Sequence, residues 1–482
     1  MAELRQKASK NLIYKIGSEV VSRLSMSVFF LVLTNLLGPE KYGAYTSVNS
    51  FFPIFAVVTD LGINLIFARN VNQNPQLFSS YFSKLTKLKF LLSFIYVLIC
   101  VLFSTMMEWT PSEVEIIWVL LIYIATFNLY ESFLYFLVGT DDLKNEARLK
   151  LFNRIASSLL GIIVLLIWKS LYWSLFIQLF VNLTSIVITL LILKRKNASP
   201  KETNHQDKNG ITLSEILKMG LPIAFLTLLT SIYYKIDVVM LKMFRGDLVE
   251  IGNYGTVLKV QEMVTIIPSM IMGALFPILN KLFSEKNEKF ELVTVKTIKV
   301  ILIYSIGMSI GGFFLSKEMI PFLFGDLYQS GGKYAQILFW SFTPLFFNMI
   351  LLNISFVYGN QIFNLYATLI SVGINVMINY FLIPSYGAVG AALATIIAEL
   401  SLTTALLFMI KNQIKIKFSD LDLVRLILPF GVLIISLFML DSLHFIVRGL
   451  ISVLLFAAAL LGFKGINQAE VDMIKEMFWK KK

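Results

Sequence analysis

The stretch Ser18–Arg69 decides the fold of this chain. It reads SEVVSRLSMSVFFLVLTNLLGPEKYGAYTSVNSFFPIFAVVTDLGINLIFAR, two long apolar runs joined by the polar hinge Gly38–Tyr42. Each run has about 20 residues or somewhat more, and a helix of that length crosses the roughly 30 Å of hydrocarbon in a bilayer. The pattern predicts two membrane-spanning helices that turn back on each other at the hinge.

The first run carries two charged residues, Glu19 and Arg23. They are four residues apart, so a helix places them on one face. Arg23 lies about 18 Å into a span that begins at Asn11, close to the bilayer midplane. An ionised side chain at that depth costs on the order of 3 kcal/mol or more unless it faces protein or water. We therefore expect a membrane protein with a polar interior.

The composition agrees with a membrane protein. Of 482 residues, 57% are hydrophobic and 15% charged, and the mean hydropathy is +0.75. Soluble domains carry about 25% charged residues. The net charge of +12 would suit nucleic acid, but lysine and arginine in a membrane protein gather in cytoplasmic loops. Cys100 is the only cysteine, which excludes an internal disulfide or a cysteine metal site, and no metal or cofactor is expected.

Apolar runs predict about fourteen spans, the second of them Gly43–Ala68. If the N-terminus is cytoplasmic, thirty of the 42 Lys and Arg residues fall on the inner side, six in outer loops and six within spans. The outer six are Lys41, Lys169, Lys242, Arg245, Lys317 and Lys333. This asymmetry predicts that both termini are cytoplasmic.

The hydrophilic segment 194–215 divides the chain. We expect an N-terminal lobe over 1–193, this segment as a cytoplasmic linker, and a C-terminal lobe over 216–410. Two more helices would occupy 411–463, and a cytoplasmic tail 464–482. Within the tail, Val471–Lys482 has the pattern of an amphipathic segment on the membrane surface.

A short repeat links the two expected lobes. The hexamer Gly252–Val257, GNYGTV, echoes Gly43–Val48, GAYTSV, at an offset of 209 residues. Both hexamers begin the second helix of a hairpin. Weak repetition of this kind is typical of transporters built from two related halves, with the substrate site between the halves.

With these features the chain resembles the oligosaccharide flippases of the polysaccharide-transport family, in the MOP superfamily that also holds the MATE exporters and the peptidoglycan-precursor flippases. The residues that carry the resemblance are Leu37–Gly43, Asp60–Gly62, Ile236–Asp237, Gly252–Tyr254, Pro268, Phe276–Pro277 and Pro384–Ala392. It implies an all-α, MATE-like fold of about fourteen membrane helices, in two pseudo-symmetric six-helix lobes plus two C-terminal helices. It also implies a multi-pass protein of the plasma (inner) membrane, which turns polyprenyl-pyrophosphate oligosaccharides from the cytoplasmic to the outer leaflet.

Such cargo requires a cationic, water-filled cavity, so the candidate residues are charges within the spans. The candidate binding cations are Arg23, Arg154, Lys235 and Lys259. The candidate acids of the cavity, with a possible role in ion coupling, are Glu19, Asp60, Asp237 and Glu262. The setting of Arg23 resembles the first-helix arginine of the peptidoglycan-precursor flippases, which lines the cavity.

Structural roles compete with several of these assignments. Glu19 and Arg23 could form a pair that only neutralises itself, and Arg154 could reach the interface as snorkelling residues do. Lys259 and Glu262, three residues apart, could form a simple salt bridge. For Asp60 the alternative is capping of a helix turn.

Two other functions compete with the flippase. An ion-coupled MATE-type exporter of drugs or metabolites would favour an acidic cavity, whereas several candidate charges here are positive. A membrane glycosyltransferase or polymerase, which would make the protein an enzyme, usually needs a large outer loop or an acidic motif. The expected partners are the lipid-linked oligosaccharide and membrane lipid, with a polysaccharide polymerase and glycosyltransferases as further candidates and no nucleic acid. The source of energy stays open.

Overall fold

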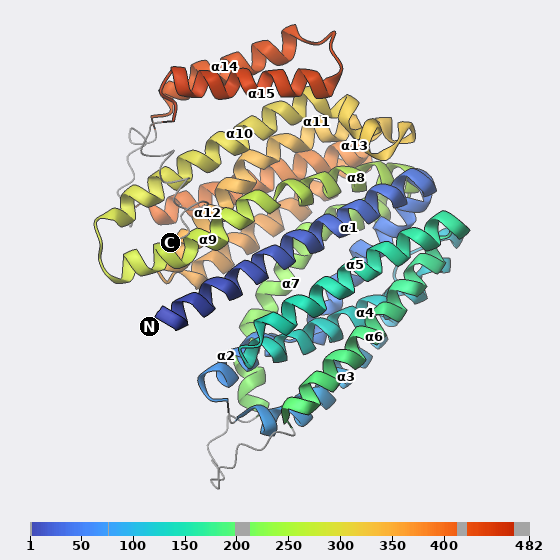
Figure 1. Ribbon diagram of the computed structural model, residues 1–482. Helices are drawn as coiled ribbons and strands as arrows, with labels where there is room; N and C mark the ends of the chain where they lie inside the picture. The colour runs from blue at the N-terminus through green and yellow to red at the C-terminus, as the bar shows by residue number, and fades with distance from the viewer. Residues whose placement is uncertain (1, 76, 198–212, 412–421, 467–482) are drawn as a thin grey trace. The chain divides into compact units, whose positions relative to one another are not determined.

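The computed structural model describes residues 2–75, 77–197, 213–411 and 422–466, and within these residues it contains helices and no strand (Figure 1). Eleven of the described helical segments are long and apolar enough to cross a membrane. The chain is thus an all-α, multi-pass membrane protein, as the sequence predicts. The predicted surface segment Val471–Lys482 lies outside the described residues, as does most of the predicted linker 194–215.

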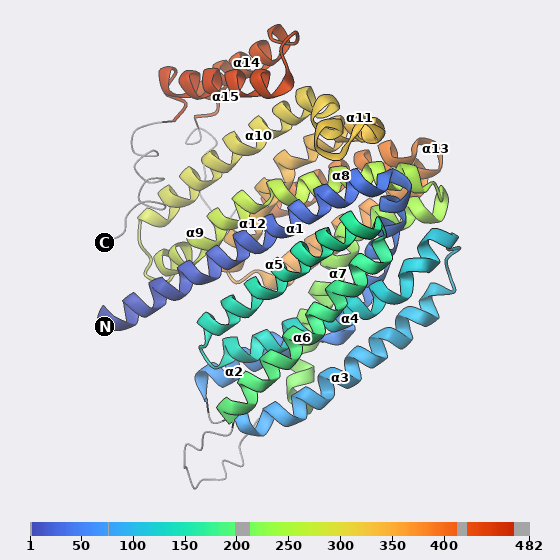
Figure 2. The ribbon, with the colours of Figure 1, turned by 45° about the vertical axis from the view of Figure 1, so that its right-hand side comes forward.

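The chain divides into two compact units, Met1–Gly252 and Asn253–Lys482. The first unit contains α1 (Ala2–Phe51), the 3-10 helix η1 (Phe52–Thr59), α2 (Ile63–Gln73), α3 (Leu77–Ser104), α4 (Pro111–Gly139), α5 (Leu143–Trp168), α6 (Leu171–Asn197), α7 (Leu213–Phe244) and the start of α8 (Leu248–Val264). In this unit α5 packs against α1 and α6, and α4 packs against α3 and α6 (Figure 2).

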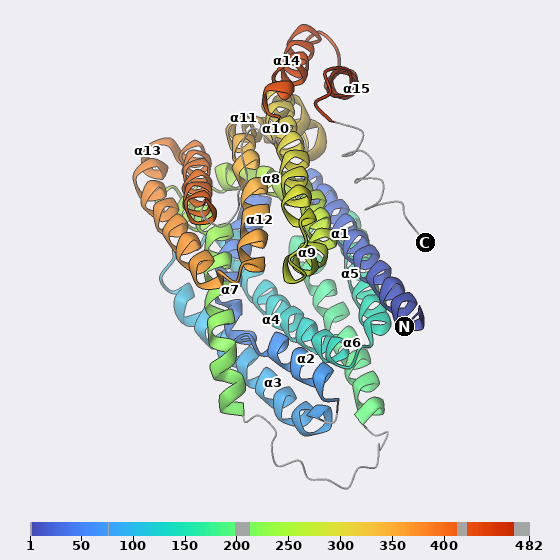
Figure 3. The same cartoon turned by 90° about the vertical axis from the view of Figure 1, so that its left-hand side faces the viewer.

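The second unit contains the rest of α8 and all later helices. These are α9 (Ile266–Ser284), α10 (Lys289–Phe324), η2 (Asp326–Tyr328), α11 (Gln329–Leu338), η3 (Phe339–Ser341), α12 (Phe342–Val357), α13 (Gln361–Ile410), α14 (Val424–Met439) and α15 (Phe445–Gly462). Helix α10 packs against α11 and α12, and α14 and α15 form a hairpin (Figure 3).

Two helices fold back on themselves. α1 and α13 each have 50 residues, about 75 Å of helix, which is far more than one crossing needs. Gly38 breaks α1 with a φ of 74°, and Gly387 breaks α13 with a φ of 56°. Glycine accepts these left-handed angles without steric cost, and Pro39 then begins the next helix at a position that suits proline. The hinge at 38–42 is therefore a turn centred on one residue, and the number of crossings stays a prediction.

The second predicted span, Gly43–Ala68, is not one continuous helix. After α1 the chain tightens into η1, whose first turn holds Pro53, and then breaks at Leu61 and Gly62 before α2. Gly62 has a φ of 73°. A Cβ on it would lie 2.3 Å from the carbonyl oxygen of Gly220 on α7, so the backbone approach requires glycine. Apolar composition alone could not show this break.

Helix α7 packs with the first unit. It contacts α1, η1 and α2, although the predicted lobe boundary at 194–215 groups its residues with the second lobe. The lobe boundaries that the sequence predicts stay a prediction. The contacts between residues divide the chain after Gly252. α7 thus contacts α1, which carries two of the charged residues described below.

The 209-residue repeat has a structural counterpart. Ser47 donates a hydrogen bond to the carbonyl of Ala44 (3.0 Å), and Thr256 donates to that of Asn253 (2.7 Å), at equivalent positions. Within the first unit, Gly43 lies against Leu248, the counterpart of Pro39, and Gly252 lies against Pro39. The added Cβ atoms would be 1.8 Å and 2.0 Å from the facing carbonyl oxygens. The contact is reciprocal, as two copies of one motif around a pseudo-two-fold axis would make it.

Candidate functional site

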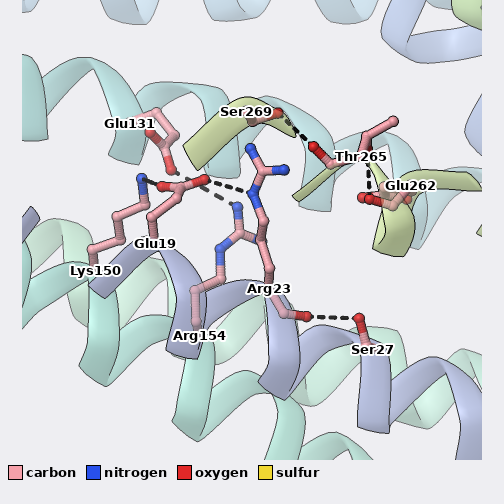
Figure 4. A network of polar contacts seen from close by, with 9 residues as sticks. All are labelled: Glu19, Arg23, Ser27, Glu131, Lys150, Arg154, Glu262, Thr265 and Ser269. Atoms are coloured by element: carbon pink, nitrogen blue, oxygen red, sulfur yellow. Dashed lines mark hydrogen bonds and ion pairs between the residues drawn. The ribbon is translucent and has the colours of Figure 1, made fainter. Parts of the chain in front are cut away.

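Three charged side chains meet where α1 passes α5 in the first unit (Figure 4). Glu19 accepts a hydrogen bond from Arg23 Nε on its Oε1 (2.9 Å) and one from Lys150 Nζ on its Oε2 (2.7 Å). The pairing of Glu19 with Arg23 follows from their spacing of four residues. Lys150 comes from α5 and was not among the candidates from sequence. Both carboxylate oxygens are therefore engaged by cations from two helices.

A fourth and a fifth charge extend this group. Arg154, one turn after Lys150 on α5, places its Nη2 atom 3.9 Å from Glu131 Oε1 of α4. Its guanidinium carbon also lies 4.2 Å from the centroid of the Phe127 ring, a cation–π geometry. The five residues Glu19, Arg23, Glu131, Lys150 and Arg154 are called the charged network from here on. It holds three cations and two carboxylates.

The network is neither sealed in the core nor compatible with lipid contact. Its side chains are 20% to 42% exposed, with Arg23 at 38% and Glu19 at 42%. It lies on helices that are apolar enough to span the membrane. Charges at such a position are stable only when they face water or polar protein. The network carries three cations and two carboxylates, a net positive charge, and arginine offers a fixed two-pronged donor geometry for phosphate oxygens.

Two further candidates, Lys235 and Asp237, lie on α7 of the first unit. The side chain of Lys235 is half-buried, and Asp237 is buried with 6% of its surface exposed. Among the sequence candidates, the structure thus brings Arg23, Arg154 and Glu19 together where α1 passes α5.

The candidates of the second unit form a local pair. Lys259 Nζ donates to Glu262 Oε2 at 2.6 Å, the i,i+3 salt bridge that the spacing allows. Two hydroxyl groups that follow donate hydrogen bonds to backbone carbonyls. Thr265 donates to the carbonyl of Glu262, and Ser269 donates to the carbonyl of Thr265, both at 2.7 Å (Figure 4).

Asp60 takes part in a separate pair that favours its structural interpretation. Lys89 of α3 is fully buried and binds Asp60 Oδ1. The same oxygen accepts the backbone N–H of Asn64 (3.0 Å), so Asp60 caps the start of α2. Lys89 lies inside α3.

A buried ion pair near the C-terminal end of α7 corrects the assignment of Lys242 to an outer loop. Lys242 lies within α7 and binds Glu113 Oε2 of α4 at 2.6 Å, with 5% and 0% of the two side chains exposed. Glu113 also accepts from Ser47, and from the backbone and hydroxyl of Thr110 (2.8 and 2.9 Å) in a capping box. This pair could not be predicted from the sequence, because its members are 129 residues apart.

The fold and the charged network together define a multi-pass membrane protein with a cluster of ionised side chains, net positive in charge, on its apolar helices. Comparison with known proteins supplies the family. The model of the polysaccharide biosynthesis protein family matches residues 8–283, more than half of the chain, and the chain belongs to this family. The MatE family model matches residues 222–381. The capsular polysaccharide biosynthesis protein CapF of Staphylococcus aureus is 24% identical over 398 residues, which cover 81% of this chain and 96% of CapF.

Solved structures show the same fold. The lipid II flippase MurJ in its inward closed conformation matches with a TM-score of 0.70 and 15% identity, over 96% of this chain and all of MurJ. An inward-facing multidrug resistance MATE transporter of the MOP superfamily matches with a TM-score of 0.59 and 16% identity, over 80% of this chain and 96% of that one. The fold predicted from the sequence, that of the MOP superfamily, is confirmed.

Proposed function

We propose that this protein is a flippase that moves a polyprenyl-pyrophosphate oligosaccharide from the cytoplasmic to the outer leaflet of the plasma membrane, for assembly of a surface polysaccharide. The family is that of polysaccharide biosynthesis proteins, and both CapF and the flippase MurJ resemble the chain over nearly their whole length. The same relatives point to a transporter and not to a catalyst.

The charged network is the observation that carries this proposal. A pyrophosphate needs several donors and a compensating positive charge, and Arg23, Lys150 and Arg154 supply both on a partly exposed surface within the spans. Alternating access would expose this surface first to the cytoplasm and then to the outside, while the lipid tail stays in the bilayer. Both termini would be cytoplasmic, and glycosyltransferases and a polymerase would act before and after the transport step.

Ion-coupled export of drugs or metabolites is the second candidate, since the MatE model matches residues 222–381. It predicts that activity depends on acids and not on cations. Loss of Asp237 or Glu19 would abolish export, and loss of Arg23 would be tolerated. The two functions therefore make opposite predictions for Arg23.

Surface display of the glycan in cells tests the proposal. Arg23→Ala should stop display while the protein stays folded and inserted, because the first-helix cation is lost. Arg23→Lys should retain part of the activity as a point charge, and Arg23→Gln little. Lys333→Ala, which changes an exposed residue of α11, is the control and should be nearly silent. If Arg23→Ala and Glu19→Ala are each inactive but the double variant recovers, the pair is structural and the proposal loses its site.

A further inference from the structure

The centre of the charged network is a carboxylate and not a cation. Glu19 binds Arg23 with one oxygen and Lys150 with the other. In the part of the chain that the structure describes, Nε is the only nitrogen of the Arg23 side chain that makes a hydrogen bond or ion pair, and the terminal nitrogens are open (Figure 4). Glu19 thus occupies the position of an anionic ligand between two cations.

Contacts other than those of Glu19 also hold α1 against α5. The same two helices meet elsewhere through Ser158, whose hydroxyl lies 3.4 Å from the sulfur of Met26. Further along, the ring of Phe29 packs so closely on Gly161 that a Cβ there would be 2.9 Å from it. Ser158, Phe29 and Gly161 are buried, whereas Glu19 is 42% exposed and its ion pairs are partly screened by solvent. A mobile, replaceable role suits Glu19 better than a structural one.

We propose that Glu19 is the displaceable counter-ion of the transport site, a built-in competitor that occupies Arg23 and Lys150 until the diphosphate of the cargo replaces it. The inference rests on the proposed function, because it takes the cargo to be a diphosphate. With Glu19 displaced, Arg23 Nε and Lys150 Nζ become donors to phosphate oxygens, in addition to the open end of Arg23. When the cargo leaves, Glu19 returns to the cations and prevents rebinding. Glu19 therefore limits affinity and speeds release.

Binding of farnesyl diphosphate to the purified full-length protein in detergent tests the competitor directly, with farnesol as the uncharged probe. Glu19→Gln keeps the shape of the side chain but removes its charge. We expect it to bind farnesyl diphosphate about tenfold more tightly than the wild type, a change of about 1.4 kcal/mol. Farnesol binding should be unchanged. Lipid turnover in vesicles should be severalfold slower, because tight binding delays release.

Two variants keep the test decisive. Glu250→Gln removes a carboxylate that binds Arg245 at 3.3 Å outside the network, and should leave diphosphate binding unchanged. Glu19→Asp keeps the charge but shortens the side chain by one methylene, which weakens its ion pairs with Arg23 and Lys150. It should bind farnesyl diphosphate about threefold more tightly than the wild type, and it replaces Glu19→Gln in the test if that variant does not fold. Unchanged or weaker binding by both Glu19 variants, while the wild type binds the probe, overturns the competitor alone. If the wild type shows no preference for farnesyl diphosphate over farnesol, the proposed function itself fails.

Discussion

The buried pair of Glu113 and Lys242 allows a quantitative prediction about the stability of the first unit. Glu113→Ala removes a fully buried carboxylate and leaves the ammonium of Lys242, 5% exposed, without its counter-charge. Loss of one partner from a buried ion pair costs about 3–5 kcal/mol. The capping box at Thr110 is lost as well, which adds about 1 kcal/mol. The expected destabilisation is therefore about 4–6 kcal/mol.

Thermal unfolding in detergent, followed by loss of the monodisperse peak in size-exclusion chromatography, measures this effect. Because 1 kcal/mol shifts the midpoint by about 2–4 °C in a unit of this size, we expect a fall of at least about 8 °C for Glu113→Ala. Lys242→Met should fall by a similar amount. The double variant Glu113→Leu with Lys242→Met should recover most of the loss, since no charge is left buried. Additive losses, or an unchanged midpoint for Glu113→Ala, would refute the assignment of the pair.

Two other predictions follow from the backbone and the charge pattern. Gly43→Ala should destabilise the protein strongly, because its Cβ would lie 1.8 Å from a backbone oxygen, whereas Gly373→Ala, with open space around it, should be neutral or slightly stabilising in the same unfolding assay. For topology, single cysteines introduced by Arg195→Cys, Lys41→Cys and Ser330→Cys, after replacement of the native cysteine by serine, should react with an impermeant thiol reagent in intact cells only in the last two variants. Labelling at position 195 with protection at 41 and 330 would show the opposite orientation and contradict the predicted topology.

The fold was predictable from sequence because its determinants are local. Long apolar runs define membrane helices, and the 209-residue repeat places equivalent turns at Ala44–Ser47 and Asn253–Thr256. The short-range pairs were predictable for the same reason. The spacing of Glu19 from Arg23, and of Lys259 from Glu262, sets each pair on one helical face.

The partners supplied by distant helices were not predictable. Lys150 lies 131 residues from Glu19, and Lys242 lies 129 residues from Glu113. Lys89 and Lys150 also lie one residue inside the predicted spans Leu88–Met107 and Leu149–Trp168, where a lysine normally reaches the interface. The sequence therefore distributes these cations among loops and snorkelling positions. Only the packing of α1 on α5, and of α3, α4 and α7 with their neighbours, shows that they complete ion pairs.

Transport by the purified protein in vesicles tests the central claim most directly. A lipid-linked oligosaccharide and a cationic dye are followed across the same bilayer, for the wild type and for Arg23→Gln. The flippase account predicts that the wild type turns over the lipid-linked oligosaccharide and that Arg23→Gln largely loses this activity. Export of the dye without turnover of the lipid would contradict the account.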